Sequence, residues 1–334
     1  MNPQSSPTIL PELQPEEFRD VFTRIEQSIH RVVVGMDDVV RGCLMGLVAG
    51  GNVLLEGVPG LGKTLLVKSI GDALSLSFSR IQFTPDLMPA DITGTKLVVE
   101  DEHGGKRFEL HRGPIFHNVV LADEVNRATP KTQSAMLEAM QERQVTILGE
   151  TLQLPRPFFV VATQNPLEMD GTYPLPEAQL DRFFFKLQVE FPGLEQLRTI
   201  LARTTQGESP RVEPACDGPT LLAMGKLARE VMVKQAVTDY AIRLVLATHP
   251  EIAGAPDITQ QYVRYGASPR GAQALLLAAK IRALLEGRVN ASHDDVAAIA
   301  RPALRHRLIL NFEGEAEGVE PDTVVETILS GVPR

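Results

Sequence analysis

The segment LLEGVPGLGKTLL, residues 54–66, constrains the fold of this chain more than any other stretch. Within it, residues 57–64 fit the pattern G-x-x-x-x-G-K-[ST], between a short apolar run at 53–55 and the helix-like segment KTLLVKSIGDAL. A glycine-rich loop in that context can fold its backbone N–H groups around phosphate oxygens, and the helix N-terminus favours negative charge. The segment therefore predicts an α/β fold with a phosphate-binding loop.

Two side chains of this loop have expected chemical roles. Lys63 should meet the β- and γ-phosphates of a nucleotide, and the Thr64 hydroxyl should help to hold Mg²⁺. The alternative is a glycine-rich turn that only joins a strand to a helix. On the phosphate-binding interpretation, the residues that contact the nucleotide are Gly57, Val58, Pro59, Gly60, Leu61, Gly62, Lys63, Thr64 and Leu65.

The strands and helices around the loop predict a parallel sheet covered on both faces. Apolar runs at 53–55, 118–124 and 158–166 alternate with helical patterns at 17–32, 63–74 and 129–143. Two segments, 94–114 and 143–157, each contain two β-prone runs around a polar, glycine-containing turn, which is typical of a hairpin. Both hairpins would be insertions into the α/β core.

The length of 334 residues favours two domains. Beyond the last apolar strand the chain becomes rich in leucine and alanine at helical spacing, and residues 207–220 carry three prolines. We therefore expect an α/β domain at 1–206, a linker at 207–220 and a helical domain at 221–334.

Composition suggests a cytoplasmic protein. The N-terminus lacks a basic segment followed by an apolar run, and the most apolar later stretch is interrupted by Lys280 and Arg282, so we expect neither secretion nor a membrane span. The two cysteines, Cys43 and Cys216, have no neighbours at metal-ligand spacing and are expected to be reduced, buried thiols. The net charge of −9 disfavours nucleic acid as a partner.

Polar residues at the ends of two apolar strands predict hydrolytic chemistry. Asp123 should bind Mg²⁺ and Glu124 should polarise the attacking water, although an acidic pair after a strand can also be a solvated turn. Asn165 could position the same water, or belong to a simple Asn-Pro turn. Arg182 is interpreted as an arginine finger for the γ-phosphate, the alternative being a surface pair with Asp181.

Five ordered segments, GVPGLGKT, LADEVNRATPKTQSAMLEAMQE, VATQNP, PEAQLDRF and YGASPRG, resemble the MoxR family of AAA+ ATPases. The resemblance implies a helical lid, hexameric rings, Asn165 as sensor 1 and Arg270 as sensor 2. It also implies that the two hairpins face the central region of the ring. The segment VVVGM resembles the adenine-side segment of the family and adds Val34 and Gly35 to the nucleotide contacts; the family usually has Gln where this chain has Met36.

The expected function is therefore Mg-dependent ATP hydrolysis that remodels or activates a partner protein. The family resemblance further implies a role in maturing protein complexes or metal-cofactor enzymes, with a von Willebrand factor A domain protein as a possible adaptor. A motor on nucleic acid is the main alternative, but the hairpin turns EDEHGGKR and LGET lack the excess of cations needed to grip phosphates. A nucleotide-gated switch and a small-molecule kinase are the further alternatives.

Several other residues have weaker predictions. Arg127 and Arg143 are interpreted as solvated charges at helix ends, although either could face a neighbouring subunit. Three of the histidines, His111, His117 and His306, are expected at the surface or in caps rather than in a metal site. The tyrosines Tyr262 and Tyr265 are expected to support the lid around Arg270.

Overall fold

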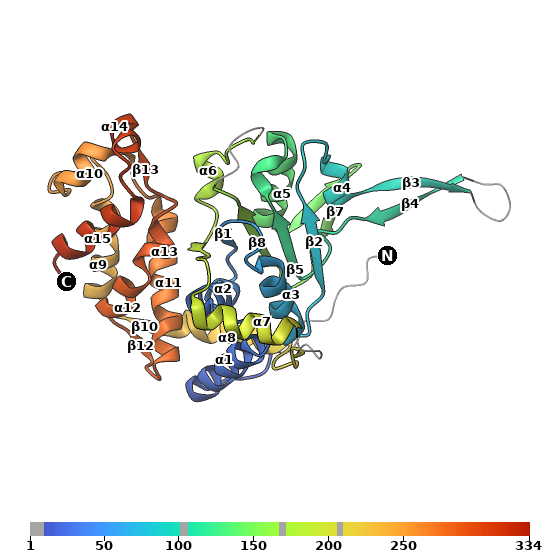
Figure 1. The fold of residues 1–334 in the computed structure, drawn as a ribbon, viewed down its shortest axis with the longest axis horizontal. Helices are drawn as coiled ribbons and strands as arrows, with labels where there is room; N and C mark the ends of the chain where they lie inside the picture. Colours follow the sequence, from blue (N-terminus) through green and yellow to red (C-terminus); the bar gives the residue numbers. More distant parts are fainter. Residues whose placement is uncertain (1–9, 101–105, 167–171, 206–209) are drawn as a thin grey trace.

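The computed structural model describes residues 10–100, 106–166, 172–205 and 210–334. Its centre is a five-stranded sheet in the order β2-β5-β8-β1-β9, and every neighbouring pair is parallel (Figure 1). The strands are β1 (Val53–Glu56), β2 (Phe78–Gln82), β5 (Val119–Asp123), β8 (Phe159–Gln164) and β9 (Phe185–Gln188). The predicted parallel sheet is confirmed, whereas β2 and β9 were not predicted.

Alternate residues of the central strands enter two separate hydrophobic clusters. Val119 and Leu121 pack on one face of the sheet, and Val120 and Ala122 pack on the other. This is the pattern of a strand that is buried on both sides. The first face is covered by α2 (Asp37–Ala49) and α3 (Lys63–Ala73), with α1 (Pro15–His30) packed on α3, and α5 (Pro130–Glu142) contributes to the second.

Both predicted hairpins are present. The longer one pairs β3 (Gly94–Glu100) with β4 (Lys106–Arg112) and projects away from the sheet (Figure 1); its predicted turn at 101–105 lies outside the described residues. The shorter one pairs β6 (Gln144–Ile147) with β7 (Glu150–Gln153). An ion pair of 2.9 Å between Lys96 Nζ and Glu150 Oε2 joins the two hairpins, so they are neighbours in space.

The C-terminal part is helical, as predicted, with two short strand pairs that the sequence did not indicate. Its helices are α8 (Gly218–Glu230), α9 (Gln235–Leu246), α10 (Asp257–Tyr262), α11 (Pro269–Leu285), α12 (His293–Ala298), α13 (Ala300–Leu304), α14 (Phe312–Ala316) and α15 (Pro321–Gly331). The strand pairs are β10 (Met232–Val233) with β12 (Asn290–Ala291), and β11 (Val263–Tyr265) with β13 (Ile309–Leu310). Helix α8 begins inside the expected linker, where the Asp217 side chain accepts from the Thr220 N–H at 2.9 Å.

Shorter helices connect the elements of the core. They are α4 (Pro89–Thr93), the 3-10 helix η1 (Val125–Arg127), α6 (Glu177–Leu180) and α7 (Leu194–Thr205). Among the described residues, no helix is long and apolar enough to cross a membrane. Both cysteines are free; Cys43 is fully buried and Cys216 partly so, and burial raises the pKa of the Cys216 thiol to about 11, with the negative charge of Asp217 adding to the effect.

Candidate active site

The glycine-rich loop leaves β1 at the carboxyl edge of the sheet and leads directly into α3. Gly60 and Gly62 have φ angles of 83° and 80°, a left-handed conformation that glycine adopts without steric cost. The Lys63 ammonium donates to the Gly57 carbonyl at 2.5 Å and so lies along the inside of the loop. Burial lowers the pKa of Lys63, and the negative charges of Asp123 and Glu124 oppose that change. The loop therefore holds its cation beside the predicted carboxylates.

Strand register brings the predicted acidic pair to the same edge. Ala122 of β5 is opposite Ala162 of β8, and Leu55 of β1 is opposite Thr163. Because all three strands are parallel, the residues that follow them converge beside the loop. The first N–H of the loop, that of Gly57, donates to the carbonyl of Gln164 at 3.2 Å, which fixes the loop to the end of β8. Asn165 follows directly and is 5% exposed.

A buried threonine that sequence reasoning missed connects the two carboxylates. The Thr163 hydroxyl donates to Asp123 Oδ1 at 2.6 Å and accepts from the backbone N–H of Glu124 at 2.8 Å. Glu124 itself has a left-handed backbone, with φ 56° and ψ 50°, which is uncommon outside glycine. Thr163 thus holds the carboxylate of Asp123 and the turn that aims Glu124. In the sequence, the signal for this role was Thr163 itself, the first polar residue in the otherwise apolar run FFVVATQNP.

The oxygen ligands present suit Mg²⁺. A hard cation prefers carboxylate and hydroxyl oxygens and takes the remaining ligands from phosphate and water. Asp123 and Thr64 provide such oxygens at the end of β5 and the start of α3. Within the described part of the chain, no group of three or more His, Cys, Asp or Glu residues could hold a metal by itself. The residues therefore fit a metal that arrives with a nucleotide.

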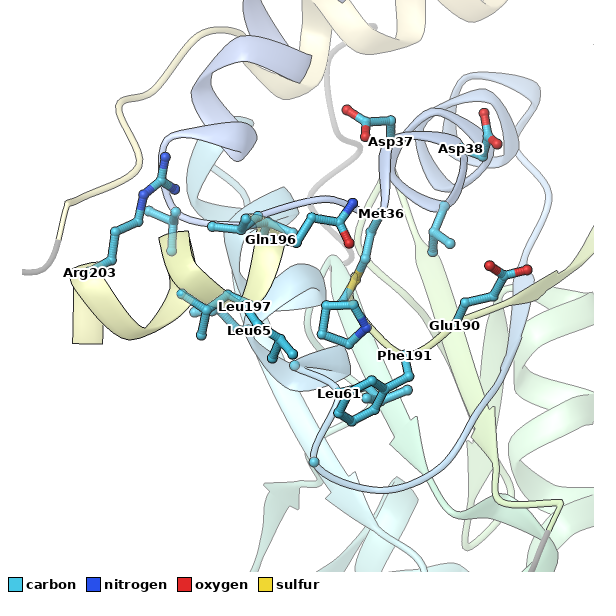
Figure 2. A pocket seen from close by; sticks show the side chains of 18 of the residues that line it. Met36, Asp37, Asp38, Leu61, Leu65, Glu190, Phe191, Gln196, Leu197 and Arg203 are labelled. Carbon is cyan, nitrogen blue, oxygen red and sulfur yellow. The ribbon is translucent and has the colours of Figure 1, made fainter. Parts of the chain in front are cut away.

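A cavity of about 510 Å³ opens beside the glycine-rich loop (Figure 2). Its lining includes the predicted Val34, together with Leu61 and Leu65 of the loop region, and it also includes Met36. Gly35, with φ 70°, lies against the Gln196 side chain, because a Cβ there would lie 2.7 Å from Gln196 Nε2. The mostly apolar walls suit the faces of a nucleobase, with the phosphates directed towards the loop.

The far wall of this cavity comes from a segment that the sequence analysis did not assign to the site. Phe191, Gln196 and Leu197 lie at the start of α7 or just before it, and they line the same cavity as Leu61 (Figure 2). Phe191 is 72% exposed, so its ring is accessible from the cavity that it lines. Only the fold brings this segment, which follows β9, to the loop that follows β1.

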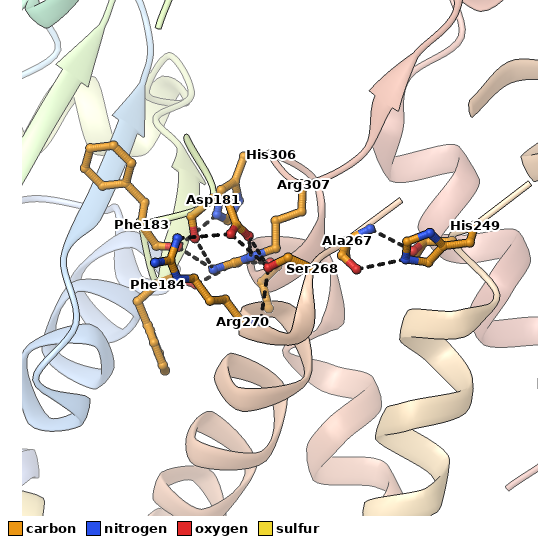
Figure 3. Close-up of polar contacts among 11 residues, drawn as sticks. Asp181, Phe183, Phe184, His249, Ala267, Ser268, Arg270, His306 and Arg307 are labelled. Carbon is orange, nitrogen blue, oxygen red and sulfur yellow. Dashed lines mark hydrogen bonds and ion pairs between the residues drawn. The ribbon is translucent and has the colours of Figure 1, made fainter. Parts of the chain in front are cut away.

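A second cluster surrounds Asp181 at the opposite edge of the sheet (Figure 3). The Asp181 carboxylate accepts from Arg307 Nε at 3.0 Å, from Arg270 Nη1 at 3.3 Å and from the Ser268 hydroxyl at 2.8 and 2.9 Å. Arg182 donates instead to the carbonyl of Leu137 at 3.3 Å. The alternative of a surface Asp181–Arg182 pair is therefore not what the structure contains.

Arg182 and Arg270 line a common surface cavity of about 620 Å³, together with Gly51, Arg229 and Lys280. Gly51 precedes β1, whereas the glycine-rich loop follows it. Arg182 likewise precedes β9, whose Phe185 is opposite Val53, the first residue of β1. The two arginines thus lie at the amino edge of the sheet, and the four residues of β1 separate them from the loop by about 13 Å at ~3.3 Å per residue.

The predictions for two other side chains were wrong. His306 is buried rather than at the surface, and its Nε2–H donates to the carbonyl of Phe183 at 3.0 Å. Burial, reinforced by the Arg307 charge, holds the pKa of His306 well below its usual value, so the ring is neutral. Arg143 is half-buried and donates to the Gly50 carbonyl at 2.6 Å, which makes it a structural contact and not a solvated helix end.

The remaining weaker predictions have mixed outcomes. Arg127 Nη1 forms an ion pair of 2.9 Å with Glu124 Oε2, so its charge acts on the site and not only on solvent. Tyr262 donates to Glu317 at 2.7 Å, and Arg264 lies over the ring of Tyr265. Support of Arg270 by these tyrosines stays a prediction.

The parallel sheet, the glycine-rich loop and the carboxylates at its edge define a P-loop ATPase with a helical lid. Residues 52–185 match the family described as "ATPase family associated with various cellular activities (AAA)", and residues 256–328 match the family described as "AAA lid domain". The class of protein is therefore an AAA+ ATPase.

Similar proteins identify the family within that class. The chain is 43% identical to Chaperone MoxR1 of Mycobacterium tuberculosis over 91% of its length and 80% of that protein. It is 30% identical to Protein MoxR of Methylorubrum extorquens, covering 95% of this chain and 96% of that one. A crystal structure from Cytophaga hutchinsonii, provisionally described as an ATPase, superimposes with a TM-score of 0.88 at 40% identity, covering 96% of both chains. The chain belongs to the MoxR family of AAA+ ATPases.

Proposed function

We propose that this chain hydrolyses Mg·ATP in a ring of identical subunits, with hexamers as the expected form, and uses the reaction to remodel or activate a partner protein. In this proposal the loop and Lys63 bind the phosphates, and Thr64 and Asp123 hold the metal. Glu124 accepts a proton from the attacking water, which Asn165 helps to position. The metal would supply charge neutralisation at the phosphates.

The observation that carries the proposal is the separation of the site into two halves. Lys63, Asp123 and Glu124 lie at the carboxyl edge of the sheet, whereas Arg182 and Arg270 lie at its amino edge. A charge that stabilises the γ-phosphate must come within hydrogen-bonding distance of it. We infer that both arginines serve the nucleotide bound to the neighbouring subunit, Arg182 as finger and Arg270 as sensor 2.

Exposed apolar residues on the hairpins favour a protein as the partner. Phe108 of β4 is 73% exposed and is opposite Val98 of β3, which is 58% exposed. Leu148, in the turn between β6 and β7, is 74% exposed. Apolar side chains of this kind suit contact with polypeptide, whereas gripping a nucleic acid needs cations along the contact.

The wider setting follows from the family. The Mycobacterium relative is named a chaperone, which supports work on proteins. A von Willebrand factor A domain adaptor, a role in maturing protein complexes or metal-cofactor enzymes, and a cytoplasmic location are further parts of the proposal. The alternative of a motor on nucleic acid predicts salt-sensitive binding of single-stranded DNA by the wild-type ring.

Mixed rings test the proposal. Arg182→Ala subunits keep an intact nucleotide site, and Glu124→Gln subunits keep an intact finger. Each variant alone should bind ATP and hydrolyse it very slowly, because the first lacks a finger, worth roughly 10³- to 10⁵-fold in rate, and the second lacks the base. Co-assembled rings should regain activity at each interface where an intact arginine finger faces an intact nucleotide site. Mixed rings that show no recovery, or a dilute monomer as active as the assembly, would contradict the shared site, and unimpaired turnover by Glu124→Gln would contradict the proposed base.

A further inference from the structure

Strand β2 directs two polar side chains at the acidic pair, although neither belongs to the motifs discussed above. Gln82 is opposite Asp123 in the sheet, and Arg80 precedes it by two residues, so both side chains lie on one face of the strand. Arg80 donates to Asp123 Oδ2 from Nε at 3.0 Å and from Nη2 at 2.7 Å. Gln82 donates to Glu124 Oε2 at 2.9 Å.

These two residues are also connected to each other, because Arg80 Nη2 donates to Gln82 Oε1. One guanidinium therefore binds the carboxylate expected to hold the metal, and it orients the amide that binds the carboxylate expected to act as base. The Asp123 side chain is 11% exposed, and its other oxygen, Oδ1, is bound by Thr163. The oxygen of Asp123 that Thr163 leaves accessible is thus the one that Arg80 binds.

We propose that Arg80 is a positioning residue that competes with Mg²⁺ for Asp123 and thereby sets how strongly nucleotide binding depends on the metal. The inference rests on the Mg·ATP site proposed above. In the structure Arg80 binds Oδ2, and a nucleotide-bound metal would have to displace it before Asp123 could serve as a ligand, directly or through water.

The exposure of Arg80 makes that exchange feasible. Its side chain is 47% exposed, so solvent screens its ion pair with Asp123 and the guanidinium can leave that carboxylate at a small cost. A fully buried arginine in the same place would hold Asp123 too firmly to be displaced. The competing hypothesis is that Arg80 only orients Asp123 for the metal, in which case removing Arg80 should weaken metal-dependent binding.

The two hypotheses predict opposite changes in one ratio when Arg80 is removed. The dissociation constant of a fluorescent ADP analogue would be measured in excess EDTA and in excess Mg²⁺, and the first value divided by the second. Removing one positive charge near the phosphates weakens nucleotide binding both in EDTA and in Mg²⁺, so much of that general effect cancels in the ratio. Arg80→Gln should raise the ratio by about tenfold, as expected for losing a half-exposed charged hydrogen-bonded pair. Arg80→Lys should give an intermediate value.

Arg127→Gln is the matched control, because it removes a charge of the same sign from the same site but from Glu124 instead of Asp123. Its ratio should stay within about twofold of wild type. Melting temperatures in EDTA would check that each variant is folded. If Arg80→Gln is not folded, the ratio for Arg80→Lys tests the proposal in its place.

The outcomes separate the inference from the proposed function. If wild type binds the analogue equally well with and without Mg²⁺, the Mg·ATP site is contradicted and the inference with it. If wild type depends on Mg²⁺ while Arg80→Gln leaves the ratio unchanged or lowers it, only the role of Arg80 is overturned. An equal rise in the Arg127→Gln control would also overturn it, because the effect would then be general electrostatics.

Discussion

Replacing Arg307 with Met should loosen the junction between the C-terminal helices and the segment before β9. The Arg307 side chain is 2% exposed and connects several groups of that segment. It donates to the Asp181 carboxylate at 3.0 Å, to the Asp181 carbonyl at 3.0 Å and to the Phe183 carbonyl at 2.7 Å. Burial lowers the pKa of Arg307, and the Asp181 charge opposes this. The methionine would fill similar space but could donate to none of these groups.

The expected cost follows from these contacts. Breaking a buried ion pair by removing one partner typically costs about 3–5 kcal/mol. Asp181 would keep the Ser268 hydroxyl and Arg270, so the lower end, about 3 kcal/mol, is expected here. An unfolding entropy of about 2.1 cal/mol/K per residue gives about 0.7 kcal/mol/K for a chain of 334 residues, so the melting temperature should fall by roughly 4 °C.

Thermal denaturation followed by circular dichroism would measure this fall. Arg301→Met is the matched control, because Arg301 lies on α13, is 52% exposed and, among the residues that the structure describes, forms an ion pair only with Glu326. Its melting temperature should change by less than about 2 °C. Nucleotide binding should survive in Arg307→Met, since Lys63 lies at the other edge of the sheet, while ring-dependent hydrolysis should fall. A melting temperature within about 2 °C of wild type would refute the junction role of Arg307.

Three further predictions address the loop, a hairpin and the lid. Lys63→Ala should lose nucleotide affinity in a fluorescence titration, because bound phosphate would lose its cation, and binding at wild-type strength would contradict the loop assignment. Deleting residues 148–151 should leave basal ATP hydrolysis within about tenfold, or about 1.4 kcal/mol, while abolishing work on the partner; loss of salt-sensitive DNA binding instead would favour a nucleic-acid motor. Burial opposes ionisation of Asp295, but hydrogen bonds from Arg288 and Ser292 outweigh it and lower the pKa from 3.8 to about 2. The carboxylate therefore stabilises the fold above about pH 4 and loses this effect towards pH 2, so Asp295→Asn should cost about 2 kcal/mol in urea unfolding at neutral pH and little at pH 2; a constant difference would contradict this.

The parts of the fold that could be predicted from sequence are those with a strong local pattern. The strands β1, β5 and β8 are continuous apolar runs, and the polar residues that follow them mark the carboxyl edge. Strand β2 lacks this signal because it lies at the edge of the sheet and only Ile81 is fully buried. Strand β9 is short, and its apolar run looks like a continuation of the segment around Arg182.

The parts of the site that could not be predicted depend on partners far away in sequence. Thr163 matters because β8 lies between β5 and β1, and Arg80 matters because the register of β2 against β5 places it beside Asp123. In the segment RHRLIL, Arg307 looks like one of several solvated cations, and only the docking of the C-terminal helices buries it. An arginine can bind any carboxylate or carbonyl that the fold brings near, so residue type alone does not identify its partner.

The position of the two halves of the site also limits how subunits can associate. The loop and the carboxylates lie at the carboxyl end of β1, and the cavity that contains Arg182 and Arg270 lies beyond its amino end. A subunit pair with two-fold symmetry would bring like surfaces together, whereas completing a nucleotide site needs one surface of each kind. If the arginines act on a neighbour, the contact must therefore be head-to-tail, and every subunit of a closed ring contributes both a nucleotide site and a finger. A ring is then the arrangement that leaves no site incomplete, which is why mixed assemblies test the function more directly than any variant studied alone.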